Sequence, residues 1–552
     1  MQTPKRLLVA FVVIAGSVAA QVPTIFGVVN GASGIPMGVP NYAIAAGSIF
    51  VVYGSNLGAV PPGGAPAASA SLPLPTAGFA GTSMAVTVNG TTLQVPILYT
   101  SPTQLAGVMP SATPSGTGML TVTYGGQSGA GPVTVLASAF GISNQRVPSG
   151  HETAAVTFGA KQSELVTVID SAAPGDVLVL FGTGLGPSIG GNDTTHPMPG
   201  NLGTAPTVFV GGVASPKVSY YGRSPLLPGL DQIIFTVPPN APLGCHVSII
   251  VQTANQGVPI VSNAPATAIA ATGHTPCTDS VNAFPAQLLG FPVNSQILGI
   301  SLIENTSFLP APGSNTLPMN PAITDTYQIL ASQFSPKQFF GLSLNLAEST
   351  NGSCFAGFVP NVAVPPTLPP ANYLDTGTFV TLTPPSGAPF MLPAAAAGVY
   401  LGRDSMGVPA GTWGFSTPGG ANVGPLNFQF PIGQPVTWTN QTSVMTTPVN
   451  RAGGLTITWS GGDAFNGFVD IQGFAANSTG TFLVGYDCSA PISAGSFTIP
   501  PSVLLRMPTG PGAFSTLQVS TFALPFNILP VEGFDAIVNF SQNQTIVPIV
   551  YQ

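Results

Sequence analysis

The same glycine-bounded apolar motif occurs twice in this chain. The first copy reads GSIFVVYGSNLG over residues 47–58, and the second reads GDVLVLFGTGLG over residues 175–186. Each apolar run is too short for a membrane span or an ordinary helix, and glycines at both borders favour a strand buried on both faces. The repeat therefore predicts two copies of one β-module in the first half of the chain.

The sequence around each motif has the spacing of a β-sandwich, with turn signals about every 8–12 residues. The strands expected in the first module are 49–53, 84–88, 93–99 and 120–124. Those expected in the second are 177–181, 207–210, 218–221, 233–237 and 247–251. Residues 61–80, mostly Pro, Gly, Ala and Ser, show no strand period and are expected to form a surface loop.

These motifs and the runs between them resemble the immunoglobulin-like TIG (IPT) domain. In the first copy the motif is followed by VTVNG (86–90), VPILY (95–99), VMP (108–110) and LTVT (120–123). In the second it is followed by VFVGG (208–212), VSYY (218–221) and FTVP (235–238). The pair, over about residues 25–270, is similar to a tandem unit of a large family of secreted acidobacterial proteins. The resemblance implies a fold and carries no catalytic signature.

The second half of the chain keeps the β-rich pattern without the glycine motif. LTITW (455–459) alternates apolar and polar residues, as a strand with one solvated face does. Further expected strands are 468–471, 496–499 and 517–521. The segments QPVTWTNQ (434–441) and SAGSFTIPPSVLLRMP (493–508) also resemble C-terminal parts of secreted proteins from the same bacterial group.

The expected architecture is all-β, with tandem immunoglobulin-like (TIG/IPT) sandwiches followed by further β-sandwich domains. The expected boundaries are a signal peptide (1–20), TIG-like sandwiches (21–139 and 140–272), an irregular β-domain (278–433) and a C-terminal immunoglobulin-like sandwich (434–552). Each of these domains is expected to be an independent module with its own apolar interior.

The first 20 residues have the three-part layout of a secretory signal peptide. Lys5 and Arg6 precede an apolar run over 7–15, and small residues follow at 18–20, which places cleavage after Ala20. No later run reaches the roughly 18 unbroken apolar residues of a membrane helix. We therefore expect a secreted or cell-surface protein without a transmembrane segment.

Charged side chains make up 5% of the chain, against about 25% in ordinary soluble domains. Without Lys5 and Arg6, 8 basic residues face 17 acidic ones, a net charge of −9. The scattered basic residues do not form the clusters that nucleic acid requires, so no nucleic-acid partner is expected. Weak electrostatic repulsion between copies favours self-association or adhesion to a surface such as a polysaccharide, and a composition bias of secreted β-proteins explains the deficit equally well.

Four cysteines, Cys245, Cys277, Cys354 and Cys488, predict two disulfides in an exported chain. Three pairings are possible. Cys245 lies in an expected strand and Cys277 just beyond the module, so a bond between them would tie the linker to its module. Cys354 with Cys488 would follow by elimination. No pair has the short spacing of a zinc site.

One segment of the sequence carries a candidate catalytic serine. Residues 186–190 (GPSIG) fit a G-x-S-x-G nucleophile elbow, and Asp193 and His196 follow at once. That elbow requires a helix after the serine, and the following GGNDTTHPMPG cannot form one, so a loop is expected. The glycines at 182, 184 and 186 likewise lack the spacing of a phosphate-binding loop.

The histidines offer no metal-ligand pair at helical or hairpin spacing. They are His151, His196, His246 and His274. No catalytic residue, metal or cofactor is therefore expected. A pair of carboxylates far apart in sequence stays open, which leaves a secreted hydrolase with a site in residues 278–433 as one alternative function.

Three tryptophans, Trp413, Trp438 and Trp459, offer a second alternative. Exposed aromatic rings in β-context can stack on sugar faces, whereas a single tryptophan in a sandwich is usually a core residue. Their exposure decides between an array of carbohydrate-binding modules and the main expectation. That expectation is a non-enzymatic extracellular or cell-surface protein that acts in adhesion, matrix or surface display.

Overall fold

The computed structural model describes residues 21–60, 68–146, 152–279, 295–307, 322–334, 349–360, 372–463, 467–510, 515–523, 529–531 and 534–552. These residues form strands joined by turns with a few short helices, so the expected all-β fold class is confirmed. The expected signal peptide, His151 and part of the expected loop at 61–80 lie outside the described residues.

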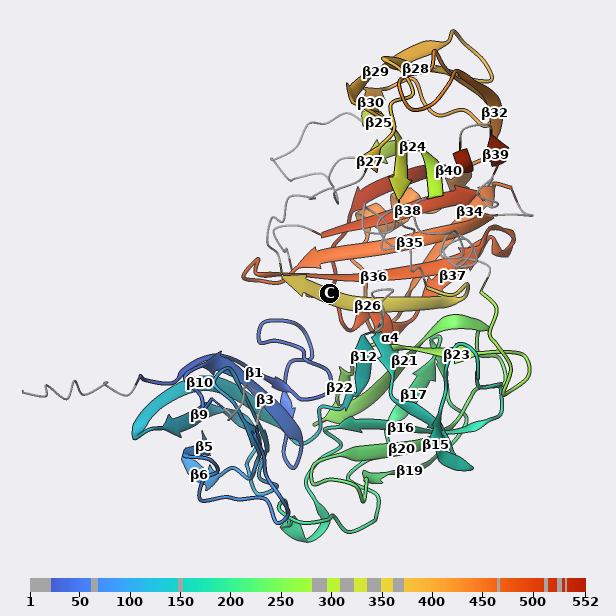
Figure 1. Ribbon diagram of the computed structural model, residues 1–552. Helices are drawn as coiled ribbons and strands as arrows, with labels where there is room; N and C mark the ends of the chain where they lie inside the picture. Colours follow the sequence, from blue (N-terminus) through green and yellow to red (C-terminus); the bar gives the residue numbers. More distant parts are fainter. Residues whose placement is uncertain are drawn as a thin grey trace, which may run out of the picture.

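Module 1, residues 24–136, is a sandwich of two sheets (Figure 1). One sheet has the order β1 (Thr24–Asn30), β3 (Ile49–Ser55), β8 (Gln104–Val108), β7 (Ile97–Thr100), β4 (Ala68–Ser69). The other has the order β2 (Ile44–Ala45), β10 (Gln127–Leu136), β9 (Gly116–Tyr124), β5 (Thr82–Val88), β6 (Thr91–Gln94). Met84, Val86 and Val88 alternate inward along β5 and fill the space between the sheets with residues such as Phe50 and Val52 of β3.

Module 2, residues 141–269, repeats the sandwich. One sheet has the order β15 (Lys161–Leu165), β14 (Val156–Phe158), β16 (Val177–Thr183), β20 (Asp231–Thr236), β19 (Val218–Arg223), with β11 (Gly141–Ile142) beside β16. The other has the order β12 (Asn144–Arg146), β13 (Glu152–Ala154), β23 (Ala266–Ile269), β21 (Gly244–Asn255), β17 (Thr207–Val210), β18 (Val213–Ala214), with β22 (Val258–Val261) beside β21.

The two copies of the glycine motif occupy the same place in the two modules. The first copy contains β3, paired with β1 and β8, and the second contains β16, paired with β14 and β20. Both are interior strands, as expected from their apolar runs. The expected strand at 93–99 is divided, because β6 ends at Gln94 and β7 begins at Ile97. Pro96 lies in the gap and has no N–H to donate to a sheet ladder.

The C-terminal part, the described residues from 295 to 552, is built on one long sheet (Figure 1). Its order is β26 (Ser353–Pro360), β36 (Phe482–Pro491), β35 (Gly467–Ala476), β38 (Ser515–Ala523), β40 (Phe534–Pro548), β24 (Ser295–Ser307), β25 (Ala322–Phe334), β30 (Val399–Asp404), β29 (Phe390–Ala396), β28 (Phe379–Thr383), β31 (Gly411–Thr417), β32 (Leu426–Ile432). Two short strands extend it, β27 (Asn372–Tyr373) beside β25 and β39 (Leu529–Val531) beside β40.

A smaller sheet accompanies the long one, with the order β33 (Val436–Trp438), β34 (Leu455–Gly461), β37 (Ser496–Ile499). In β34, Ile457 and Trp459 point inward between exposed or half-buried threonines, as the alternating sequence predicts. Short helices lie nearby or in module 2: η2 (Ile189–Gly191), α3 (Gln441–Thr446), η3 (Ile492–Ala494) and α4 (Pro501–Leu504). No described helix is long and apolar enough to cross a bilayer.

The long sheet crosses the boundary expected at residue 433. β24 pairs in parallel with β40 through eleven residues, from Ile297 opposite Ala536 to Ser307 opposite Ile546, and β26 pairs with β36. Strands from 278–433 and from 434–552 thus share one hydrogen-bonded sheet. A sequence pattern shows that a segment is a strand, but it does not show which distant strand completes the ladder.

Candidate functional site

A buried arginine joins module 1 to module 2. Arg223 ends β19 and is 1% exposed. Its Nη2 atom donates to the carbonyl oxygens of Gly47 in module 1 (2.6 Å) and Gly186 in module 2 (2.5 Å). Its Nη1 atom forms an ion pair with Asp231, the fully buried first residue of β20. One guanidinium holds both modules, because its planar fork presents several donors at once.

Asp231 is satisfied on its other side by backbone amides. Its Oδ2 atom accepts hydrogen bonds from the N–H groups of Gly184 (2.7 Å) and Leu185 (2.8 Å). Burial raises the pKa of the Asp231 carboxyl, and Arg223 together with these two amides opposes that shift. Such complete pairing is the condition under which a buried ion pair persists, and removal of either partner would leave a buried charge without compensation.

Polar side chains from both modules continue this junction. Thr183 Oγ1 accepts from the amide of Ile49 in module 1 (2.8 Å) and donates to the carbonyl of Gly229 (2.6 Å). Asn30 Nδ2 donates to the carbonyls of Ala139 (3.1 Å) and Thr183 (3.2 Å). Because an unpaired buried polar group costs about 1–3 kcal/mol, these bonds favour a single orientation of module 1 on module 2.

The glycine motif therefore serves the junction as well as the strand ends. Gly47 opens the first copy at a φ of 74°, and a Cβ there would lie 2.3 Å from Arg223 Nη2. Gly184 stands in the second copy at a φ of 117°, and a Cβ there would lie 2.1 Å from the carbonyl oxygen of Ala139. Glycine permits the positive φ at both positions, the close approach of module 2 at Gly47, and that of the connecting residue Ala139 at Gly184.

The candidate nucleophile elbow belongs to the same junction. Ser188 Oγ donates to Asp193 Oδ1 (3.1 Å), and Asp193 also accepts the amide (2.7 Å) and the hydroxyl (2.6 Å) of Ser111 from module 1. His196 does not complete a triad, since its Nδ1 atom lies 3.0 Å from the carbonyl oxygen of Pro225. The serine is followed by the single turn η2, so the segment is a loop that links the modules, as its glycines indicate.

Both modules also contact the C-terminal part. Asn41 of module 1 donates to the carbonyl of Leu505 (3.1 Å) and accepts from the amide of Val261 in module 2 (3.1 Å). The Arg506 guanidinium, on a residue only 4% exposed, donates to the carbonyl of Ser262 in module 2. Side chains at this second junction thus bridge three segments that lie more than 200 residues apart in sequence.

One apolar core continues across the three parts. Module 1 contributes Ile35 and Val39, module 2 contributes Ile250, Val261 and Ala264, and the C-terminal part contributes residues that include Trp438, Trp459, Val503 and Leu504. The green strands of module 2 meet the C-terminal part beside α4 in Figure 1. The expectation of independent modules is corrected here, because the parts share buried apolar surface.

Three acidic residues form a row across adjacent strands of the C-terminal part. Glu304 on β24 is the register partner of Asp325 on β25, and Asp325 is the register partner of Asp404 on β30. Residues directly opposite on neighbouring strands have Cβ atoms about 4.5–5.5 Å apart. A group of acids within 278–433 is the feature that the hydrolase alternative requires, so its surroundings matter.

Backbone amides donate hydrogen bonds to all three acids of this row. The N–H groups of residues 406, 407 and 408 donate in turn to Asp404 Oδ1 (3.1 Å), Asp325 Oδ2 (2.6 Å) and Glu304 Oε2 (2.7 Å). Asp325 is fully buried, and burial together with its contact to Asp404 raises the pKa of the Asp325 carboxyl to about 7. The arrangement holds the segment after β30 on the sheet.

A pocket lies beside the row without including its acids. The described residues that line it are Val408, Ile432, Gly433, Gln434, Pro435, Thr521, Ser541, Gln542 and Asn543. Asn543 connects pocket and row, since its Nδ2 atom donates to Glu304 Oε1 (2.7 Å). The described lining supplies neutral hydrogen-bonding groups and contains no carboxylate.

The three tryptophans are core residues. Trp413, Trp438 and Trp459 are 1%, 8% and 5% exposed, and each indole Nε1 donates to an internal acceptor at 2.8–2.9 Å. A sugar ring cannot stack on a ring face that other side chains cover. The hypothesis that these three residues bind a ligand by stacking is therefore wrong.

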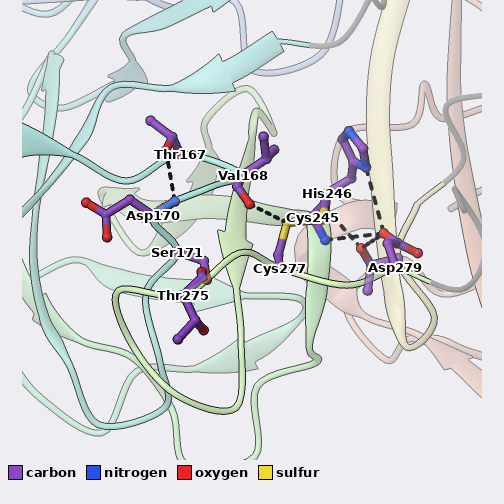
Figure 2. The surroundings of a disulfide bond; sticks show 10 residues. Thr167, Val168, Asp170, Ser171, Cys245, His246, Thr275, Cys277 and Asp279 are labelled. Atoms are coloured by element: carbon purple, nitrogen blue, oxygen red, sulfur yellow. Dashed lines mark hydrogen bonds and ion pairs between the residues drawn. A yellow bond between two sulfur atoms is a disulfide. The ribbon is translucent and has the colours of Figure 1, made fainter. Parts of the chain in front are cut away.

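The cysteines pair as Cys245 with Cys277 and Cys354 with Cys488. The first bond ties the segment after β23 to β21, and Figure 2 shows that segment beside residues 167–171. There Cys277 donates its N–H to the carbonyl of Val168 (3.0 Å). The second bond joins facing residues of β26 and β36 in the long sheet. The sequence positions of the cysteines favoured the first of these bonds, and the second followed by elimination.

Sequence reasoning missed Arg223, Asp231 and the acidic row. The signal was a lone charge within or next to an apolar strand run, as in SYYGR (219–223) and DQIIF (231–235), in a chain with 5% charged residues. Charged residues are almost never fully buried unless they are paired. Which residue would be the partner depends on strand register, and the sequence alone does not supply it.

Comparison with known proteins finds likenesses among solved structures alone. No family model matches this chain, and no curated protein matches it. Among solved structures, it is similar to the titin Ig tandem domains A164-A165 (11% identity, 45% of this chain, 96% of that chain, TM-score 0.12). It is also similar to Sidekick-1 immunoglobulin domains 1-4 (12% identity, 95% and 99% covered, TM-score 0.11) and the S-layer protein rSbsC(31-844) (11% identity, 97% and 55% covered, TM-score 0.16).

The fold and its junctions together define a class. The chain is an all-β protein with two sandwich modules, a C-terminal part built on one long sheet, and two disulfides, and its described parts are joined by buried polar contacts and shared cores. Likenesses with TM-scores of 0.11 to 0.16 say nothing of what it binds.

Proposed function

We propose that this protein is a non-enzymatic, secreted extracellular or cell-surface protein that acts in adhesion, matrix building or surface display. One observation carries the proposal: charged groups such as Arg223 and Asp231 are used inside the junctions, where they fix the parts as one body. A stiff body with a weakly charged exterior suits a protein that presents a surface or packs against its own copies.

The sequence supports the same proposal. The signal-peptide layout and the two disulfides fit an oxidising compartment outside the cytoplasm. The resemblance of residues 25–270 to tandem TIG domains of secreted acidobacterial proteins fits an extracellular role. The acids that a hydrolase in 278–433 would need are bound to backbone amides, which favours a structural use of them.

Light scattering of the mature protein, residues 21–552, during size-exclusion chromatography tests the proposal. We expect the mass to rise with loading concentration, and the rise to persist at high salt because little charge is involved. A sharp monomer at every concentration would count against matrix building. A quartz-crystal microbalance with polysaccharide-coated and bare surfaces then tests adhesion. Absence of bound mass on every surface would contradict a role in adhesion.

A further inference from the structure

A histidine and two carboxylates converge on the surface of module 2. Glu164 lies on β15, Asp170 lies in the loop after it, and His274 follows β23. One ligand atom from each lies within 4.8 Å of the other two, and His274 Nδ1 is 2.9 Å from Asp170 Oδ1. A tetrahedral zinc ion with bonds of about 2.0–2.2 Å separates its ligand atoms by about 3.4 Å, so small side-chain rotations complete the set.

The surrounding structure holds these groups together before any ion binds. The His274 ring packs on the ring of Phe158, with centroids 4.2 Å apart. Its backbone N–H donates to the carbonyl of Ser171 (2.8 Å), so residue 274 is fixed beside residue 170. Three residues further on, Cys277 is bonded to Cys245 (Figure 2). The imidazole and the carboxylates come from two segments that backbone hydrogen bonds hold side by side, and the Cys245–Cys277 bond ties the segment of His274 to β21.

We propose that Glu164, Asp170 and His274 form a binding site for a divalent transition-metal ion of the zinc type. One imidazole nitrogen with two carboxylate oxygens suits zinc, whereas calcium prefers oxygen ligands alone. Three protein ligands leave one position for water or a partner's side chain. The ion fastens the segment that leaves module 2 to β15 and its loop, and so adds to the Cys245–Cys277 bond.

Lys161 competes with the ion for the carboxylate of Glu164. Its Nζ atom lies 3.0 Å from Glu164 Oε1, in an ion pair whose side chains are 68% and 38% exposed. Exposed pairs of this kind contribute little, and a divalent ion displaces the ammonium group from the carboxylate. The variant Lys161→Met therefore binds the ion more tightly than the natural chain does.

Isothermal titration of the metal-free mature protein with zinc chloride tests the site, with a thiol assay to show that both disulfides are intact. We expect one zinc ion per chain. His274→Ala weakens binding by about 10-fold or more, since even residues that only support metal ligands typically account for 10–100-fold. His196→Ala is the matched control, because this exposed histidine lies outside the group, and it leaves binding unchanged.

Thermal unfolding provides the second readout. Saturating zinc raises the melting temperature of the natural chain and of Lys161→Met but not that of His274→Ala, each compared with the same chain without metal. Absence of zinc binding to the natural chain, equal binding by His274→Ala, or equal competition by calcium would each overturn the proposal. If His274→Ala folds poorly, a Lys161→Met variant that binds no more tightly than the natural chain contradicts it independently.

Discussion

The acidic row predicts a pH dependence of stability that one substitution removes. The pKa of the Asp325 carboxyl is raised from 3.8 to about 7 by burial and by its contact with Asp404. Glu304 and the hydroxyl of Tyr327, which donates to Asp404 Oδ1 (3.1 Å), complete the titratable groups around it. Asp325→Asn keeps the shape of the protonated acid, retains an oxygen for the amide of residue 407, and offers an N–H to Asp404.

The direction in which stability changes with pH depends on whether the folded or the unfolded state holds the Asp325 proton. Between pH 3.8 and about 7 the folded state keeps the Asp325 proton while the unfolded state loses it, so the folded state binds more protons. The contribution of Asp325 is therefore fully retained below pH 3.8 and is lost as the pH rises through the folded value. At 1.36 kcal/mol per pKa unit, the loss is up to about 4 kcal/mol by pH 8. Asparagine does not ionise, so the variant is spared that loss.

Urea unfolding at pH 4.5, 6 and 8, followed by tryptophan fluorescence, measures the effect; Trp413 lies in the same core as Tyr327. We expect the free energy of unfolding of Asp325→Asn to exceed that of the natural chain by an amount that grows with pH. Asp375→Asn is the control. Asp375 also accepts backbone N–H groups, but these lower the pKa of its carboxyl, so its difference stays flat over this range. A flat difference for Asp325→Asn would refute the raised pKa of the Asp325 carboxyl.

Three further predictions concern the junction and the bonds. Arg223→Met leaves Asp231 buried without its partner and should cost about 3–5 kcal/mol in urea unfolding, while the double variant Arg223→Met/Asp231→Leu recovers part of it; an additive loss would contradict the buried pair. Gly47→Ala places a Cβ against Arg223 and should lower the melting temperature, whereas Gly90→Ala, also at positive φ but with open space around it, should cost less; equal shifts would remove the packing argument. Replacing Cys245 and Cys277 by serine opens a 32-residue loop, worth about 4 kcal/mol in the chain-entropy relation, and should expose residues 270–279 to proteases; unchanged cleavage would show that the bond is dispensable.

Local sequence pattern was enough for the strands and the two modules. Both kinds of strand are recognisable from adjacent residues, since IFVVY (49–53) is an unbroken apolar run and LTITW (455–459) alternates apolar and polar residues. Gly47 and Gly175 lie in turns just before β3 and β16, as expected for glycines that bound a strand, whereas Gly54 and Gly182 lie inside these strands. Their contacts across the junction, such as Gly47 with Arg223, join residues 176 positions apart and have no local signature.

The acidic row could not be predicted from the sequence because it forms only at one register of the paired strands. Glu304, Asp325 and Asp404 come together only when β24, β25 and β30 pair at one register, and a shift by one residue would turn Asp325 to the other face. The same holds for His274 and Asp170, which are 104 positions apart. For the tryptophans the sequence predicted the β-strand context, but it did not decide whether their rings are buried or exposed.

Small-angle X-ray scattering of the mature protein tests most directly the claim that buried junctions make one body of the three parts. We predict that a single arrangement of modules 1 and 2 and the C-terminal part fits the scattering curve, and that the radius of gyration does not change between 0.05 and 0.5 M salt, which are about the limits over which exposed charges become screened. Arg223→Met should expand it. A natural chain whose scattering requires an ensemble with module 1 moving freely would contradict the account.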